Sequence, residues 1–157
     1  MRIRRVFVMA MIVAVTAGLH AQATPNFAGT WVFNVAKSRN LGPMTALEDT
    51  LTISQTPTEL VIKDSSLFQG QQDSRELHYN LTGKATTNEG PMGDRNETVA
   101  TWENGALVTT WTRDGSVAGT KSVMTERRTL SADGKSMSVE SKRGANPPVV
   151  MVFDRRS

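Results

Sequence analysis

Residues 26–38 read Asn26-Phe27-Ala28-Gly29-Thr30-Trp31-Val32-Phe33-Asn34-Val35-Ala36-Lys37-Ser38 and form the most hydrophobic strand candidate of the folded domain. Trp31, Phe33 and Val35 occupy every second position, and a period of two is typical of a strand with one buried face. The stretches that follow have the same period. We therefore expect this stretch to open the domain and the later strands to close on it.

Residues 1–23 have the layout of a secretory signal peptide. A start rich in arginine is followed by an apolar run, residues 6–19, and by the small-x-small cleavage site Ala21-Gln22-Ala23. An uncleaved anchor is the alternative, but the run is shorter than the ~20 residues of a membrane span. Sec export is expected, with the twin-arginine route as a second option because of Arg4-Arg5. The mature protein is then one domain, residues 24–157, in the periplasm or the medium.

Charge and cysteine content exclude several classes of function. The chain has 18 basic and 15 acidic residues, but three basic residues lie in the predicted signal peptide, so the mature domain is electrically balanced. It has no excess positive charge with which to hold nucleic acid or an acidic membrane surface. The absence of cysteine excludes disulfides, thiolate metal sites, a cysteine nucleophile and a lipid anchor at the cleavage site.

The remainder of the chain has the pattern of an all-β protein. Residues 50–55, 59–63 and 75–81 alternate apolar and polar side chains, and the polar residues 67–73 are expected to form a loop. No helix of useful length is expected. We predict an antiparallel up-and-down β-barrel of roughly eight to ten strands, because closure of a barrel removes exposed sheet edges.

Three dipeptides predict the register of the second half, because each favours the positive φ angles of a two-residue hairpin turn. They are Asn104-Gly105, Asp114-Gly115 and Asp133-Gly134. A one-residue slip at any turn would move every later side chain to the opposite face. As two-residue turns they predict the facing pairs Trp102–Leu107, Ala100–Thr109, Thr98–Trp111, Trp111–Ala118, Leu130–Met137 and Arg128–Val139.

The three turns agree on one inward face, which mixes apolar and polar side chains. Its apolar members are Trp102, Leu107, Trp111, Met124, Leu130, Met137 and Val139, and its polar members are Thr98, Thr109, Thr120, Ser122, Glu126 and Arg128. A cavity with apolar walls and a few polar groups is the usual form of a site for a small ligand. The candidate ligand-binding residues are Arg128, Glu126, Trp102, Trp111, Thr109 and Tyr79.

Gly29-Thr30-Trp31, following Phe27, resembles the Gly-x-Trp signature of the lipocalins and the related fatty-acid-binding barrels. The resemblance implies that Trp31 plugs one end of the barrel and that an arginine from a late strand packs over its ring. Arg128 is the best match for that arginine, with Arg127 as its neighbour. The wider pattern is similar to small exported bacterial proteins called lipocalin-like, through residues 34–38, 129–135 and 152–155. The Thr-Asp-Tyr signature and the usual disulfide of lipocalins are absent.

Two roles remain open for the inward polar residues. Arg128 could hold a ligand carboxylate, or it could stack on Trp31 and pair with Glu126 inside a filled barrel. Trp102 and Trp111 could likewise line a pocket or simply fill the core.

No catalytic, metal or cofactor constellation is expected. His20 lies in the predicted signal peptide, and His78 is expected to point outward. The first hypothesis is an exported, non-enzymatic binding protein for a small apolar or amphipathic molecule such as a lipid or fatty acid. The alternative is a structural or interaction protein of the cell envelope with a filled barrel. An isomerase or cyclase that uses Glu126 and Tyr79 is a third option.

Overall fold

The computed structural model describes residues 24–90 and 93–156. The predicted signal peptide lies outside these residues, so its assignment stays a prediction. No helix among the described residues is long and apolar enough to cross a membrane.

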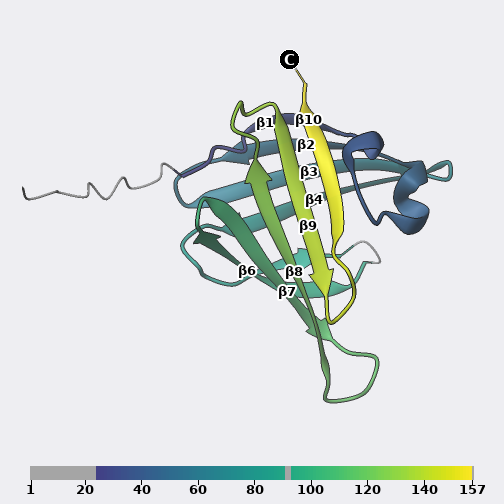
Figure 1. The fold of residues 1–157 in the computed structure, drawn as a ribbon. Coiled ribbons are helices and arrows are strands. Elements are labelled where there is room, and N and C mark those ends of the chain that lie inside the picture. Colours follow the sequence, from purple (N-terminus) through teal and green to yellow (C-terminus); the bar gives the residue numbers. More distant parts are fainter. Residues whose placement is uncertain (1–23, 91–92, 157) are drawn as a thin grey trace, which may run out of the picture.

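Ten antiparallel strands form one sheet that curls into a nearly closed barrel, which confirms the predicted fold class (Figure 1). Neighbours in the sheet are neighbours in the sequence, except that the last strand pairs with the first. In Figure 1 the strands β8, β9 and β10 cross in front of β2, β3 and β4. The strands are β1 (Gly29–Phe33), β2 (Leu47–Gln55), β3 (Glu59–Phe68), β4 (Gln71–Asn80), β5 (Thr86–Glu89), β6 (Arg95–Glu103), β7 (Ala106–Asp114), β8 (Lys121–Leu130), β9 (Ser136–Arg143) and β10 (Val149–Arg155).

Two short 3-10 helices, η1 (Val35–Lys37) and η2 (Gly42–Ala46), separate β1 from β2. Val35 was expected to continue the first strand, but it lies in η1 and is exposed. The Asn34 side chain accepts a hydrogen bond from the Lys37 backbone N–H, which caps this turn and ends the strand.

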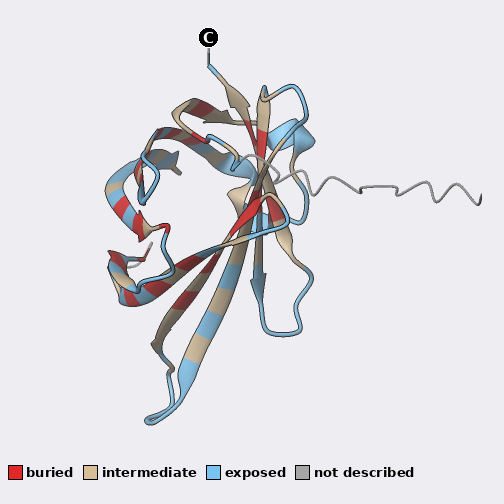
Figure 2. Cartoon of the chain, turned by 90° about the vertical axis from the view of Figure 1, so that its left-hand side faces the viewer, coloured by how far each residue is buried: buried red, intermediate tan, exposed pale blue. Residues whose placement is uncertain are grey.

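Buried and exposed residues alternate along most of the strands, as Figure 2 shows. The buried positions form one apolar core inside the barrel. The alternation follows from the pleat, because successive side chains of a strand point to opposite faces.

Trp31 plugs one end of the barrel. Its ring is fully buried, and its Nε1 donates to the Phe27 carbonyl oxygen at 2.8 Å. Phe27 stacks on Trp102, with ring centroids 6.0 Å apart. We call the end that holds Phe27, Trp31 and Trp102 the plugged end.

The arginine over the plug is Arg155, which corrects the assignment of this role to Arg128. The Arg155 guanidinium carbon lies 4.1 Å from the centre of the Trp31 ring. The pairing of β1 with β10 places Arg155 directly opposite Trp31, whereas Arg128 pairs with Leu107 and Val139 on neighbouring strands. A sequence motif cannot decide which late arginine becomes this neighbour.

Gly29 makes room for that arginine. A Cβ atom built on Gly29 would lie 2.5 Å from Arg155 Nη1, and its φ of 133° is rarely adopted by other residues. Arg155 Nη1 donates to the Ala28 carbonyl oxygen at 2.6 Å, and Nε donates to the Gly134 carbonyl oxygen at 2.9 Å. The glycine of the Gly-x-Trp signature therefore leaves the space in which Arg155 packs over Trp31.

The turns at Asn104-Gly105 and Asp133-Gly134 have the predicted register, and the turn at Asp114-Gly115 does not. Asp114 pairs with Lys121, so residues 115–120 form a longer loop and Trp111 faces Met124 rather than Ala118. The left-handed residue of this loop is Gly119, with φ of 80°, and not Gly115. The displacement is an even number of residues, so Met124, Glu126 and Arg128 stay on the predicted face.

Residues 67–73 are not the expected loop. They form the ends of β3 and β4 around a tight turn at Gln69-Gly70, where both residues have positive φ. This part of the hairpin is largely exposed, so the apolar alternation that marks a strand is missing from the sequence.

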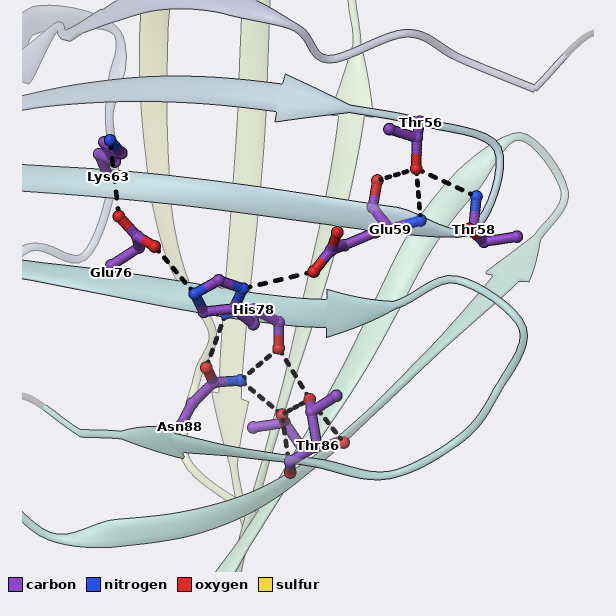
Figure 3. A network of polar contacts seen from close by, with 9 residues as sticks. Thr56, Thr58, Glu59, Lys63, Glu76, His78, Thr86 and Asn88 are labelled. Carbon is purple, nitrogen blue, oxygen red and sulfur yellow. Dashed lines mark hydrogen bonds and ion pairs between the residues drawn. The ribbon is translucent and has the colours of Figure 1, made fainter.

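Two side chains of β5, Asn88 and Thr86, bridge the gap between β4 and β5 (Figure 3), and Thr86 Oγ1 donates to the His78 carbonyl oxygen at 2.7 Å. The Asn88 Oδ1 atom accepts from the His78 backbone N–H at 2.7 Å, and Nδ2 donates to the His78 carbonyl oxygen at 2.8 Å. The Nδ2 atom also donates to Thr98 Oγ1 at 2.7 Å. Asn88 thus replaces part of a backbone ladder at the point where the barrel closes.

Replacing Trp31 with Ala should lower the free energy of unfolding by about 3–5 kcal/mol, because the plug would become a cavity. Urea denaturation measures this change. Val123→Ala, at an exposed position, is the control and should stay within about 0.5 kcal/mol of the wild type. Equal stability of the two variants would disprove the role of Trp31.

Replacing Asn88 with Leu should cost about 1–3 kcal/mol of unfolding free energy, because the His78 backbone N–H loses its partner in the gap while its carbonyl oxygen keeps Thr86. Hydrogen exchange should show faster exchange of the His78 amide. Thr87→Leu changes an exposed residue on the same strand and should leave that amide protected. Unchanged protection in Asn88→Leu would show that the amide does not close the barrel.

Candidate functional site

Charged and polar side chains also gather inside the barrel, among the apolar residues of the core. They sit at inward positions of four strands, and each lies two residues from another inward side chain. We call this group the interior polar cluster, and it consists of Asp49, Asp64, Arg75, Tyr79, Glu126 and Arg128.

Asp49 and Asp64 form a buried carboxyl pair. Arg75 donates from Nε and Nη2 to Asp64 Oδ2, at 2.9 and 2.7 Å. Burial, together with the negative charge of Asp64, raises the pKa of Asp49 to about 8. At neutral pH Asp49 therefore holds a proton, and Asp64 is the partner of Arg75.

Arg128 is buried without a counter-ion among the residues that the structure describes. It is 4% exposed, and within residues 24–90 and 93–156 neither Nε nor Nη1 has a hydrogen-bond partner. Glu126 forms no ion pair with it, although both residues are described by the structure. Glu126 Oε2 instead accepts from Trp111 Nε1 at 3.2 Å and from Thr109 Oγ1 at 3.5 Å. The expected alternative of a Glu126–Arg128 pair inside a filled barrel is thus not formed.

Tyr79 lies within electrostatic range of Glu126 and of Arg128. Its ring packs edge-on against Trp111, with centroids 6.0 Å apart, and its hydroxyl has no partner. Burial raises the pKa of Tyr79, the charge of Glu126 raises it further, and the charges of Arg128 and Arg75 lower it. The hydroxyl therefore remains a neutral donor that is within electrostatic range of both arginines.

The structure brings five of the six candidate ligand-binding residues together and separates the sixth. Trp102 packs on Phe27 at the plugged end, and Leu107 separates it from Arg128 in the register of β6, β7 and β8. The grouped candidates are Thr109, Trp111, Glu126, Arg128 and Tyr79. Their role in binding stays a prediction.

Three members of the cluster were missed from the sequence. Asp49 and Asp64 are two residues from the inward Leu51 and Ile62, and Arg75 is two residues from Leu77. Extending the period of two into these polar positions would have found them. The strands expected at residues 50–55 and 59–63 stopped one residue short of Asp49 and Asp64, whereas Arg75 opened the expected strand 75–81 and was given no inward role.

His78 points outward, as expected. Its ring is exposed between Glu76, at 2.9 Å, and Glu59, at 3.4 Å (Figure 3). Within residues 24–90 and 93–156, no three His, Cys, Asp or Glu side chains are grouped so that they could hold a metal ion.

Comparison with known proteins gives a fold but no family. No family model and no curated protein matches the chain. The fatty acid binding protein of Schistosoma mansoni, solved in complex with arachidonic acid, is 16% identical, with a TM-score of 0.65 over 83% of this chain and 96% of that one. The chain has the fold of the fatty-acid-binding and lipocalin-like barrels.

Other structures agree on this barrel fold. The fatty-acid-binding protein 1 of Echinococcus granulosus is 16% identical, with a TM-score of 0.64 over 83% of this chain and 98% of that one. Human cRBP IV is 16% identical, with a TM-score of 0.62 over 84% of this chain and 99% of that one. The neighbours named here are binding proteins rather than enzymes.

Asp49→Asn should flatten the dependence of stability on pH. Wild-type Asp49 binds its proton more tightly in the folded state, so its contribution is complete below its ordinary pKa of 3.8 and is lost as pH rises to about 8. The amide cannot titrate. The drop in unfolding free energy from about pH 5 to about pH 8 should therefore be smaller in Asp49→Asn.

Urea denaturation at both pH values measures this drop. Glu48→Gln, on the outer face of the same strand, is the control and should keep the wild-type dependence. If Asp49→Asn shows the same slope as wild type, Asp49 is not protonated in the folded barrel.

Proposed function

We propose that the protein binds a small amphipathic acid, such as a fatty acid, inside the barrel and carries it without changing it chemically. The observation that carries this proposal is the Arg128 guanidinium, buried with two nitrogens unpartnered. The solved neighbours named as fatty-acid-binding proteins support the same class of ligand.

A ligand carboxylate would remove the cost of burying Arg128. Taking a charge out of water costs several kcal/mol unless it is paired and hydrogen-bonded. A carboxylate can accept two hydrogen bonds from one guanidinium in a fork-like arrangement. Glu126 is held by Trp111, so the protein itself does not supply this carboxylate.

The apolar walls suit the remainder of such a ligand. Inward side chains of β2, β3 and β4 next to the polar cluster are largely aliphatic. An apolar chain that leaves water for this surface gains about 25 cal/mol per Å² of buried area. The walls that support this proposal are Leu51, Ile53, Leu60, Ile62 and Leu77.

We further propose that the carrier works outside the cytoplasm, in the periplasm or the medium. Support for this comes from the arginine-rich start, the apolar run and the Ala-x-Ala site in residues 1–23. The charge balance of residues 24–157 also favours a neutral or amphipathic partner over nucleic acid.

Arg128→Met should weaken binding of dodecanoic acid by at least about tenfold, the loss expected for hydrogen bonds to a charged group. Isothermal titration of delipidated protein measures the dissociation constant. Arg127→Met removes the neighbouring arginine, which points outward and pairs with Glu103, and should bind as wild type does. Dodecan-1-ol, which lacks the carboxylate, should lose little affinity in Arg128→Met.

The stability of Arg128→Met shows whether Arg128 serves ligand binding or holds the fold together. Removal of an unpaired buried charge should leave the ligand-free protein as stable as wild type or more so. A variant that binds dodecanoic acid normally, or a wild type that binds no acid, would overturn the proposed function. The second result would favour the filled-barrel interaction protein.

A further inference from the structure

Strand β4 is an edge of the sheet and runs beside the gap that Asn88 and Thr86 bridge. The sheet begins with β4 and ends with β5, and β4 pairs only with β3. The bridge takes up the backbone groups of His78 (Figure 3). Within residues 24–90 and 93–156, no backbone or side-chain group pairs with the outer side of β4 before His78. We call residues 71–77 the free edge.

The free edge presents a regular row of backbone hydrogen-bonding groups. In an antiparallel ladder the N–H and C=O of one residue point to the same side, and successive residues alternate. The His78 groups point into the gap, so those of Gln72, Ser74 and Glu76 point the same way. Such an edge pairs readily with a strand of another molecule, and the free edge has no proline that would prevent it.

The charges of the free edge favour a second copy of the same strand as that partner. Two copies related by a two-fold axis pair antiparallel about one central residue. Pairing centred on Asp73 or on Arg75 places like charges directly opposite each other, which is destabilising. Pairing centred on Ser74 places Asp73 of each copy opposite Arg75 of the other. This pairing also ends at residue 77, just before the groups that Asn88 occupies.

We propose that the protein forms a two-fold symmetric dimer in which β4 pairs with β4 of a second copy, centred on Ser74. About six backbone hydrogen bonds then join the two free edges. Arg75 bonds Asp64 through Nε and Nη2, which leaves Nη1 for Asp73 of the second copy. A contact of one strand is smaller than a standard interface, so the dimer is weak and forms at high protein concentration. It does not depend on ligand binding.

Cysteine cross-linking tests the register, because the chain has no cysteine of its own. In the proposed dimer the two copies of Ser74 face each other with Cα atoms about 5.5 Å apart, a distance that a disulfide spans. Ser74→Cys should therefore form a disulfide-linked dimer with oxidised glutathione. Ser65→Cys is the control, because Ser65 is exposed and lies opposite Ser74 on β3, away from the free edge. It should stay monomeric.

Sedimentation equilibrium of delipidated protein measures the dimer without a cross-link. Gln72 of each copy faces Glu76 of the other, so Gln72→Lys should tighten the dissociation constant about threefold to tenfold. Gln72→Glu should weaken it by a similar factor. Thr52→Lys and Thr52→Glu make the same charge changes at an exposed position of β2 and should leave it within about twofold.

Three results would overturn the dimer. One is a wild type that stays monomeric up to about 1 mM. Another is equal cross-linking of Ser74→Cys and Ser65→Cys. The third is a shift of the dissociation constant in the same direction for Gln72→Lys and Gln72→Glu. The proposed acid site is unaffected by any of these results.

Discussion

The contact between Trp31 and Arg155 is the constraint on which the rest of the barrel depends. It joins the first strand to the last, which are paired in the middle of the sheet, whereas the barrel closes between the edge strands β4 and β5. Phe27 extends the plug, because its backbone N–H donates to Gln55 and its ring packs on Trp102. A cation over a tryptophan ring contributes about 0.5–2 kcal/mol, and the packing of the rings adds the larger share.

A barrel with a packed apolar plug at one end tolerates buried polar residues elsewhere in its interior. The apolar core includes the plug. Asp49, Asp64 and Arg75 lie toward the η2 end of β2, β3 and β4, whereas Arg128 pairs with Leu107, the residue that faces Trp102. One acid–base pair is satisfied internally, and one arginine is not. Folding alone does not require an unpaired buried charge, which is why we connect Arg128 with ligand binding.

The turn dipeptides predicted the strand register better than they predicted the residues of the candidate site. Asn104-Gly105 has two positive φ angles and the expected register. Asp114-Gly115 does not form the turn, because Gly119 closes a longer loop. The register of β7 and β8 is displaced by an even number of residues, so the predicted side chains still point inward. For the site, parity placed Glu126 and Arg128 correctly on the inward face, but Asp49 and Asp64 were hidden among polar neighbours.

The sequence by itself determined the all-β class and the alternation that points side chains inward, because these depend on local periodicity and on near neighbours. The plug residue followed from the resemblance of Gly29-Thr30-Trp31 to the Gly-x-Trp signature. Only the tertiary structure decided that Arg155 covers Trp31, that Asn88 closes the barrel and that Arg128 is left without a counter-ion. Each of these depends on which strands become neighbours across the sheet and on which side chains compete for one partner. Such contacts join residues far apart in the chain, and no local pattern encodes them.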